Sequence, residues 1–348
     1  MSAFDPNAAA VEGSGIFGLP FDENDSALVY LPVPWEATTS YGGGTAGGPA
    51  AILEASHQVD LYDLDVVRPY EAGLFMLPES RQVKTWNRKA RAAAKKVIRA
   101  GGVIPERNRK LRAALATVNQ LSGRMNEYVR NETKRLLDSG KIVAILGGDH
   151  SVPFGALQAV AAKHSSFGIL HFDAHSDTRK AYEGFTWSHA SIMYNVLDKI
   201  PQVEKLVQIG IRDFCEEELE YLNSQGSRVK VYFDRDLARK KFEGTTWWNI
   251  ARDMVSELPD EVWVSFDIDG LDPRFCPHTG TPVPGGLDFQ EALHVLWLLV
   301  HLGKKIIGFD LNEVSPDPKS EWDANVGARL LYKMSALTLA SQDKVRAH

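Results

Sequence analysis

Cysteine is scarce in this chain of 348 residues, which has only Cys215 and Cys276. Two thiols so far apart in sequence do not form a disulfide framework, and their number excludes a zinc site with a mostly cysteine shell. An excess of positive charge is also lacking, because 39 Lys and Arg residues are outnumbered by 45 Asp and Glu residues. The net charge of −6 gives no reason to expect nucleic acid as a partner, and it mildly favours a small cationic ligand.

Long apolar runs are absent as well. The longest, at residues 292–302, is interrupted by His294 and His301 and is too short to span a bilayer. Residues 1–25 lack the basic start and apolar core of a signal peptide. The composition, 44% hydrophobic and 24% charged, is that of an ordinary globular protein. We therefore expect a soluble, cytoplasmic protein with no membrane partner.

Short apolar segments recur along the chain, and several are followed by Gly, Asp or Pro. Unbroken rather than alternating hydrophobicity is typical of strands covered on both faces. We expect strands at residues 27–32, 142–146, 167–172, 205–211, 229–233, 261–266 and 305–311. Helical patterns lie between them, including residues 48–55, 125–139, 153–163, 216–225, 247–257, 289–302 and 324–340. This alternation predicts an α/β protein with three layers, α/β/α, around a mostly parallel central sheet.

Two segments differ in composition from the rest of the chain. Residues 1–26 are rich in Gly, Ala, Ser and acids, so we expect an N-terminal arm followed by a single domain over residues 27–348. Residues 81–112 contain twelve Lys or Arg residues and one acid, Glu106. We interpret this segment as a basic helical insertion that pairs with an acidic neighbouring subunit, the alternative being a surface for a phosphate-bearing partner.

Acidic and histidine side chains follow three of the predicted strands, within LGGDHS (146–151), HFDAHSDTR (171–179) and SFDIDGLDP (265–273). In the second and third segments they alternate, which sends them to the same side of an extended chain. The carboxyl ends of parallel strands meet at one edge of a sheet. Four aspartates and two histidines are expected to converge there: His150, Asp173, His175, Asp177, Asp267 and Asp269.

Such a concentration of acids calls for counter-charge. Carboxylates packed closely in a low-dielectric cleft repel each other by several kcal/mol unless cations hold them. Oxygen-rich ligands with one imidazole per ion suit two divalent first-row metals such as manganese, and tolerate nickel or cobalt. Two such ions lower the pKa of a shared water and direct it at an electrophilic carbon or phosphorus. Taken singly, each segment is weak evidence, because a lone histidine such as His150 is more often structural and Asp-Pro after a strand is commonly a turn.

The same segments resemble a known family. GGDH, DAHSD and SFDIDGLDP, followed by TGTPVPGG (279–286) and GFDLNEVSP (308–316), look like the ureohydrolases, the family of arginase, agmatinase, formiminoglutamase and guanidine hydrolase. The resemblance extends from about residue 29 to residue 339. It implies an arginase-like fold and the hydrolysis of a C–N bond in a guanidinium compound, which releases urea or a urea derivative and an amine or ammonia.

The resemblance also implies how the six side chains share two divalent metal ions. The implied ligands of one ion are His150, Asp173, Asp177 and Asp267. The implied ligands of the other ion are His175, Asp173, Asp267 and Asp269. Two carboxylates, Asp173 and Asp267, would bridge the ions, and Asp269 would also take part in catalysis. Nickel is the working metal in the guanidine-hydrolase branch and manganese in the wider family, and the ligand types do not separate the two.

Three further residues are assigned by their positions in the resemblance. Glu313 stands where the family's carboxylate pairs with the guanidinium, and a carboxylate fork matches such a planar cation well. The alternative is that Glu313 caps a helix. His189, in TWSHAS, stands where a mobile-loop histidine passes a proton to the leaving nitrogen. Asp213, in IGIRD, stands at a polar position near the substrate.

Two segments bear on the substrate. WEATTSYGGGTAGGPAAIL (35–53), with Thr45, and YEGFTWSHASIM (182–193), with Trp187, resemble the guanidine-hydrolase branch. Aromatic residues in the second segment would narrow the pocket. We therefore favour guanidine itself, or a compact alkyl guanidine or biguanide such as dimethylbiguanide. Agmatinase, guanidinobutyrase and formiminoglutamase activities stay open, because Arg179 and Lys180 could meet a substrate carboxylate.

The resemblance implies a homo-oligomer, a trimer or a hexamer, and a hetero-oligomer with a paralogue remains open. A different class of function is a non-catalytic partner subunit of a hetero-oligomeric ureohydrolase. That hypothesis predicts the loss of at least one ligand, since an unused cluster of acids destabilises a fold. All six ligand positions are present, together with Glu313 and His189, which favours an active subunit.

Overall fold

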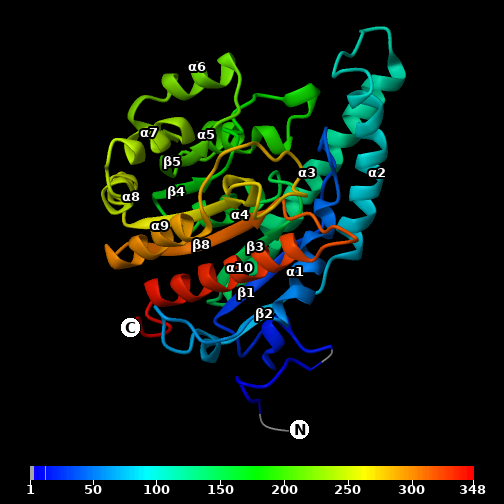
Figure 1. The fold of residues 1–348 in the computed structure, drawn as a ribbon. Coiled ribbons are helices and arrows are strands. Elements are labelled where there is room, and N and C mark those ends of the chain that lie inside the picture. Colours follow the sequence, from blue (N-terminus) through cyan, green and yellow to red (C-terminus); the bar gives the residue numbers. More distant parts are fainter. Residues whose placement is uncertain (1–3, 12) are drawn as a thin grey trace.

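The computed structural model describes residues 4–11 and 13–348 (Figure 1). Within these residues the centre of the molecule is one eight-stranded sheet with the order β2-β1-β3-β8-β7-β4-β5-β6, in which every pair of neighbouring strands is parallel. The strands are β1 Leu28–Val33, β2 Leu74–Met76, β3 Ile142–Gly147, β4 Phe167–Phe172, β5 Val203–Ile211, β6 Val229–Phe233, β7 Glu261–Asp267 and β8 Lys305–Asn312.

Helices cover both faces of this sheet. They are α1 Gly48–Ser56, α2 Arg81–Ile98, α3 Arg109–Asp138, α4 Phe154–Ala161, α5 Ile192–Lys199, α6 Glu216–Ser224, α7 Asp234–Phe242, α8 Trp247–Ser256, α9 Phe289–His301 and α10 Trp322–Ser341. Short 3-10 turns near the sheet include η1 Ile16–Gly18, η2 Thr45–Gly47, η5 His189–Ser191 and η7 Ile268–Gly270. The predicted three-layer α/β/α class with a parallel sheet is confirmed.

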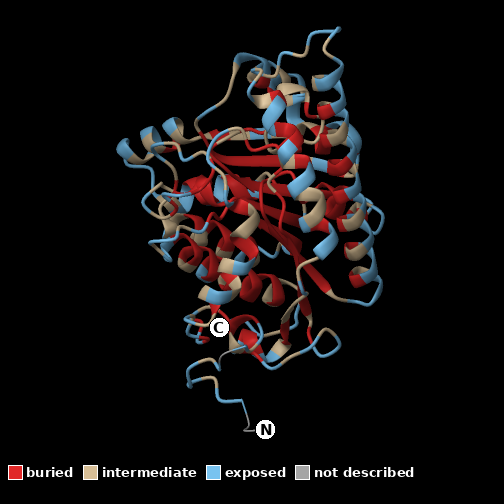
Figure 2. Cartoon of the chain, turned by 90° about the vertical axis from the view of Figure 1, so that its right-hand side faces the viewer, coloured by how far each residue is buried: buried red, intermediate tan, exposed pale blue. Residues whose placement is uncertain are grey.

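Alternate residues of each strand pack into two different apolar layers. Leu28 and Tyr30 of β1 face the layer built with α1, α8, α9 and α10, whereas Val29 and Leu31 face the layer built with α3, α4 and α5. All residues of β1, β3 and β4 are buried as a result, and the sheet forms the buried centre of the molecule in Figure 2. This double covering explains why the strands are apolar without alternation.

The seven predicted strands are present, with ends that differ from the predicted ends by at most two residues. The edge strand β2 was not predicted, because its three residues are too few to show a pattern. The helix predicted at residues 125–139 begins earlier, at Arg109. Within the described residues, no helix combines the length and the apolar character that crossing a membrane requires.

The two segments of distinctive composition are both built onto the core. Ile16, Phe17 and Leu19, from the predicted arm, are each at most 3% exposed and pack in the apolar layer of α1 and α10. This part of residues 1–26 therefore contributes to the core, in contrast to the expected arm with little core of its own. The basic segment forms α2 and the start of α3, a long helical pair that extends past the sheet in Figure 1.

Candidate metal centre

Four strands that lie side by side bring the predicted metal ligands to one edge of the sheet. The order β3-β8-β7-β4 places the carboxyl ends of these parallel strands next to one another. His150 follows β3, Asp173 directly follows β4, and Asp267 is the last residue of β7. The six predicted ligands therefore converge, although they are spread over residues 150–269 of the sequence.

The first half of the cluster surrounds the His150 ring. Its Nδ1 lies 3.1 Å from Asp173 Oδ2, 3.1 Å from Asp267 Oδ2 and 3.7 Å from Asp177 Oδ2. All four residues are at most 5% exposed. These three carboxylate oxygens and the imidazole nitrogen are the kinds of ligand that a divalent first-row cation prefers, and one such ion could bind among them.

The second half of the cluster lies on the other side of Asp173. His175 Nδ1 is 3.4 Å from Asp173 Oδ1 and 3.2 Å from Asp269 Oδ2. Asp173 thus presents one oxygen to each half, which is the geometry of a bridging carboxylate. Asp267 Oδ1 instead accepts a hydrogen bond from the Asp269 backbone N–H at 2.9 Å, so bridging by Asp267 stays a prediction.

Two residues of the site have a backbone conformation that is rare outside glycine. Asp177 has φ of 54° and Glu313 has φ of 62°. A left-handed conformation in a non-glycine residue costs on the order of 1–3 kcal/mol and persists only where the surroundings enforce it. Asp177 follows β4 and Glu313 follows β8, and both strands end at the cluster. The strained backbone therefore occurs at two residues whose carboxylates point toward His150.

Sequence reasoning missed His171, which holds the Asp173 carboxylate. Gln208 Nε2 donates to His171 Nδ1 at 2.9 Å, and His171 Nε2 therefore carries the proton that it donates to Asp173 Oδ2 at 2.9 Å. Burial lowers the pKa of His171, which keeps its ring neutral. The period-two spacing from His171 to Asp173 and His175 was the available signal.

A buried network beneath His150 was also missed. His150 Nε2 donates to Ser265 Oγ at 2.8 Å, and the Ser265 hydroxyl donates to Asp310 Oδ1 at 2.8 Å. Asp310 is fully buried and accepts further hydrogen bonds from Trp263 Nε1 and Asn312 Nδ2. This chain places the proton on Nε2, which leaves Nδ1 available as a metal ligand. Ser265 and Asp310 lie within the SFDIDGLDP and GFDLNEVSP segments, but inside buried strands, where nothing in the sequence assigned them a role.

The acids of the cluster compete for protons in the absence of a cation. Burial, followed by the Asp269 and Asp173 charges, raises the pKa of Asp267 well above its ordinary value. Burial alone would lower the pKa of His150 and His175, but the surrounding carboxylates raise both well above the ordinary histidine value. Without a metal, the two imidazoles therefore hold a proton more tightly than an ordinary histidine does.

These shifts predict that metal uptake depends on pH. A divalent ion must displace the protons of His150 and His175, so its affinity is expected to rise as the pH increases from about 6 to about 8. We expect a release of about two or more protons per chain as the cluster fills. Calorimetric titration of nickel or manganese in buffers of different ionisation enthalpy measures this number. An affinity that does not change with pH would contradict the assignment of the two histidines.

His189 faces the cluster from the loop between β4 and α5. Its Nδ1 lies 3.3 Å from Thr38 Oγ1, and its backbone N–H donates to the same oxygen at 3.2 Å. Burial, followed by the charge of His175, lowers the pKa of His189 to about 3. The ring is therefore neutral near pH 7. Thr38, which fixes its position, was not singled out from the sequence.

Glu313 reaches the cluster from the end of β8. Its Oε1 accepts a hydrogen bond from the His150 backbone N–H at 2.9 Å, while its buried Oε2 has no hydrogen-bond partner among the described residues. Burial, followed by the Asp267 and Asp149 charges, raises the pKa of Glu313 well above its ordinary value. Glu313 does not cap α10, which begins at Trp322, so the helix-cap alternative is wrong. The unpartnered oxygen is a ready acceptor for a cationic ligand.

Thr45 lies in a glycine turn that is held against the segment after Glu313. Gly42, Gly43 and Gly44 have φ of 66°, 139° and 109°, a region that side chains disfavour. A Cβ on Gly44 would stand 2.7 Å from Ser315 Oγ, so the turn approaches closely. Thr45 is fully buried, and its Oγ1 has no hydrogen-bond partner among the described residues. Its predicted role in substrate binding stays a prediction.

Three residues of the predicted substrate pocket are placed differently from expectation. The Trp187 ring packs against Phe154 of α4, with centroids 4.8 Å apart, and does not join the cluster. Phe185 is fully buried in a separate apolar cluster with α2 and α3. Arg179 Nε lies 3.3 Å from Glu218 Oε2, so its guanidinium is paired within the chain and not free to meet a substrate carboxylate. These side chains anchor the loop, a role that local sequence does not distinguish from lining a pocket.

Asp213 lies at the rim of the site. Its side chain is 67% exposed, and its Oδ2 is 3.9 Å from His175 Nε2. Its backbone N–H donates to Ala174 O at 3.0 Å, which connects β5 to the second metal segment. The carboxylate therefore faces the open side of His175, and contact with a substrate stays a prediction.

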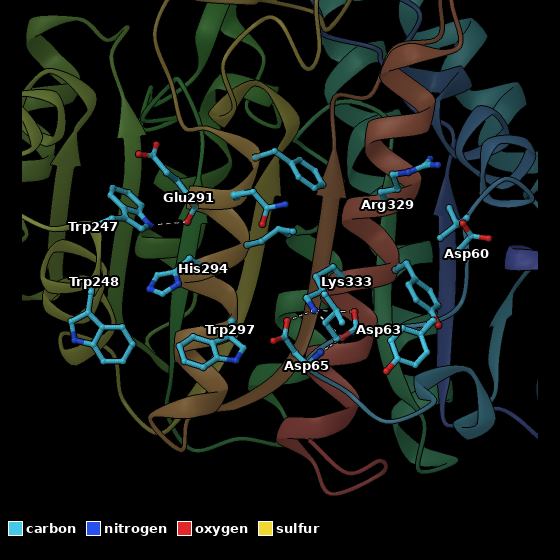
Figure 3. A pocket seen from close by; sticks show the side chains of 17 residues that line it. Asp60, Asp63, Asp65, Trp247, Trp248, Glu291, His294, Trp297, Arg329 and Lys333 are labelled. Carbon is cyan, nitrogen blue, oxygen red and sulfur yellow. Dashed lines mark hydrogen bonds and ion pairs between the residues drawn. The ribbon is translucent and has the colours of Figure 1, made fainter. Parts of the chain in front are cut away.

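A large groove elsewhere on the molecule contains none of these residues. It has a volume of about 850 Å³ and lies between α8, α9, α10 and residues 59–65, as Figure 3 shows. Trp248, His294 and Trp297 form an aromatic cluster along it, and Lys333 is neutralised by Asp63 and Asp65. No predicted site residue lines this groove.

The protein thus has a parallel sheet with a buried cluster of acids and histidines at its carboxyl edge. This arrangement is suited to a metal-dependent hydrolase. Comparison with known proteins gives the family. The model of the arginase family matches residues 26–336. The chain belongs to the arginase family, and it is a metal-dependent hydrolase that acts on C–N bonds. The predicted ureohydrolase family is thereby confirmed.

Individual relatives agree with this placement. The chain is 31% identical to an N(1)-aminopropylagmatine ureohydrolase of Synechocystis sp. over 92% of each chain, and 32% identical to one of Thermus thermophilus over 90% of each. The structure of proclavaminate amidinohydrolase from Streptomyces clavuligerus has a TM-score of 0.72, is 24% identical and covers 96% of this chain and 100% of its own. Arginase-family proteins typically hold two metal ions, and the buried cluster fits such a site.

Proposed function

We propose that this chain hydrolyses a small guanidinium compound, guanidine or a compact alkyl guanidine or biguanide such as dimethylbiguanide. The products are urea or a urea derivative and ammonia or an amine. The observation that carries the proposal is the unpartnered Glu313 Oε2, a buried carboxylate oxygen beside the acid and histidine cluster. An agmatinase-type activity is the second candidate, because relatives covering nine-tenths of the chain are named N(1)-aminopropylagmatine ureohydrolases.

The six clustered side chains would hold two divalent ions, with His150 and Asp177 on one side, His175 and Asp269 on the other, and Asp173 and Asp267 shared between them. We favour nickel from the guanidine-hydrolase likeness, with manganese as the wider family's metal. Bound ions would supply a water of lowered pKa for attack on the guanidinium carbon.

The protein's own groups would bind the substrate and move protons. Glu313 binds the planar guanidinium through a charge-assisted hydrogen bond. This contact orients the guanidinium carbon toward the acid and histidine cluster. His189, neutral near pH 7, accepts a proton released during water attack and returns it to the departing nitrogen, so that the C–N bond breaks with a neutral leaving group. Thr38 holds the His189 ring for both transfers.

Replacing His189 with alanine is expected to slow turnover without removing the metals. The reason is that His189 contacts Thr38 and is not one of the clustered ligands. We expect kcat to fall by roughly 10² to 10⁴, the usual contribution of a positioned acid or base. Steady-state kinetics with elemental analysis of the same sample measures both properties. His301→Ala, at the exposed end of α9, is the matched control. Loss of bound metal in the His189 variant would show that the residue is a ligand.

The substrate is tested by separate reconstitution with nickel and manganese, followed by a urea-release assay. The panel contains guanidine, dimethylbiguanide, agmatine, guanidinobutyrate and arginine. The proposal predicts the highest kcat/KM for a compact compound without an amino-acid head. Activity on arginine alone would overturn it, and highest activity on agmatine would favour the second candidate.

We also propose a homo-oligomer, a trimer or hexamer, in the cytoplasm. Proteins of the family act on guanidinium compounds and form oligomers. The groove in Figure 3 supports an assembly of copies of this chain, because Tyr62, Leu64 and Trp248 beside it are 77%, 81% and 39% exposed. Apolar surface of this kind is typical of contacts between chains. A hetero-oligomer with a paralogue is the alternative assembly.

A further inference from the structure

The helical pair α2 and α3 packs against both loops that enclose the candidate site. Phe185, in the loop that carries His189, is fully buried in a cluster with Ala94, Val97 and Val118 of the two helices. Asn119 of α3 fastens the same loop on both sides of Phe185. Its Nδ2 donates to Gly184 O at 3.3 Å, and its Oδ1 accepts from the Thr186 N–H at 3.0 Å. The helical pair is therefore fixed relative to His189.

Arg91 of α2 holds the second loop. Its Nη1 donates to the backbone oxygen of Thr39, the neighbour of the threonine that positions His189. Its Nη2 lies 3.4 Å from the point where a Cβ on Gly43 would stand. Burial is the main reason that the pKa of His189 is lowered to about 3, and the Arg91 charge adds to this shift, so the charge acts inside the site.

The opposite side of the same loop meets the proposed guanidinium anchor. A Cβ on Gly42 would stand 2.6 Å from Gly280 O, and a Cβ on Gly280 would stand 3.1 Å from Glu313 Oε2. Residues 39–44 thus lie between Arg91 and the free oxygen of Glu313. This loop therefore connects the Arg91 guanidinium to the place where a substrate guanidinium would bind Glu313.

Arg91 forms no ion pair with another of the described residues. Within residues 4–11 and 13–348, no carboxylate oxygen lies within 4.0 Å of an Arg91 nitrogen. Glu36, the acid on the same loop, uses Oε2 to accept the backbone N–H groups of Gly44 and Ala46. A fixed cation held against a loop beside an acidic site repels a second positive charge on a ligand there and attracts a negative one.

We propose that Arg91 is a specificity-determining residue that selects against guanidinium substrates with a second positive charge. This inference rests on the proposed function, whose guanidinium anchor is Glu313. It predicts that the chain discriminates by the charge of the substrate's tail, in addition to its length. Compact, neutral-tailed and anionic-tailed guanidinium compounds are accepted, and amine-tailed ones such as agmatine are disfavoured.

The test compares three substrates with tails of similar length and different charge. Agmatine has a cationic tail, pentylguanidine is its neutral counterpart, and 4-guanidinobutyrate is anionic. The metal-loaded full chain is assayed as wild type, Arg91→Gln, Arg91→Glu and Arg91→Lys, with Lys95→Gln on the exposed face of α2 as the control. Metal content and thermal midpoint are recorded for every protein.

The ratio of kcat/KM for agmatine to that for pentylguanidine is expected to rise about tenfold in Arg91→Gln and about a hundredfold in Arg91→Glu. The ratio for 4-guanidinobutyrate moves in the opposite direction. Arg91→Lys and Lys95→Gln keep the wild-type ratios, the first because the charge is retained. A general defect in folding or loop position lowers all three rates together and leaves the ratios unchanged, which would overturn the proposal.

The role of Arg91 and the proposed function fail through different results. If the metal-loaded wild type hydrolyses none of the three compounds nor guanidine, the proposed function itself is wrong. If it hydrolyses them and the ratios in the Gln and Glu variants stay within about twofold of wild type, Arg91 has no role in selecting the tail. Should the Gln and Glu variants not fold, agmatine ratios below one in wild type and in Arg91→Lys support the proposal, and ratios at or above one overturn it.

Discussion

Asp267→Asn is expected to remove bound metal and to lower kcat/KM by roughly 10³ or more, while the fold is retained. Substituting a residue that only supports a metal ligand typically lowers metal affinity or activity by about 10-fold to 100-fold. Loss of a direct ligand should lower them further. Asp267 directs Oδ2 at His150 Nδ1 from 3.1 Å at the end of β7. An amide at that position supplies a weaker, uncharged ligand and removes one of the charges that balance two dications.

Although Asp267→Asn lowers activity, it is not expected to lower the stability of the metal-free protein. Burial and the neighbouring Asp269 and Asp173 charges raise the pKa of Asp267, so its ionised form destabilises the metal-free chain. The metal-free Asn variant should therefore unfold at the same temperature as the metal-free wild type or higher. Asp260→Asn, whose side chain is 96% exposed, is the matched control. A variant that keeps both metals and full activity would contradict the ligand assignment.

Glu313→Gln is expected to lower kcat/KM by roughly 10² to 10⁴ while both metal ions stay bound. Glu313 Oε1 accepts the His150 N–H, and its Oε2 is buried and unpartnered. In glutamine, the oxygen can still serve His150, but an NH₂ group then faces the guanidinium. The glutamine NH₂ and the guanidinium N–H groups are both hydrogen-bond donors, and the glutamine side chain has no charge. The interaction that would hold the substrate is therefore lost.

Kinetics and metal analysis separate this effect from damage to the metal site. Because the interaction is with substrate, the loss should appear in KM as well as in kcat, with metal content unchanged. Glu321→Gln, an exposed acid before α10 that makes no capping hydrogen bond through its side chain, provides the control. Unchanged kinetics in Glu313→Gln would place the substrate elsewhere.

Much of the sheet could be predicted because its inner strands, such as β3 and β4, are buried on both faces. β4 Phe167–Phe172 and β6 Val229–Phe233 end where their apolar runs end. The strand order could not be predicted in the same way, because it depends on packing between distant segments. That order, β3-β8-β7-β4, is what brings His150, Glu313 and Asp267 together. The edge strand β2 was missed because one short parallel pairing leaves no periodic pattern.

The convergence of the proposed metal ligands was predictable, and the residues that support them were not. Asp173, His175 and Asp177 are recognisable by their alternate spacing after an apolar run, which is costly without a function. Ser265 and Asp310 sit inside buried strands, where one polar residue has many structural explanations. Their role appears only when the hydrogen bonds from His150 through Ser265 to Asp310 are seen together.

The placement of aromatic residues in the His189 loop also required the structure. Phe185 and Trp187 are equally suited by composition to a substrate pocket and to a packing surface. Their actual partners, α2, α3 and α4, are distant in sequence. For the same reason the contact between Arg91 and the Thr39 loop, 52 positions apart, could not be read from the basic composition of the segment.

The metal centre is tested most directly by the number of metal ions that each chain binds. Elemental analysis of the purified protein, as isolated and after incubation with nickel or manganese and removal of excess ion, gives this number. The convergence of four aspartates on His150 and His175 predicts two divalent first-row ions per chain. Protein that contains none and takes up none, while remaining folded, would contradict it.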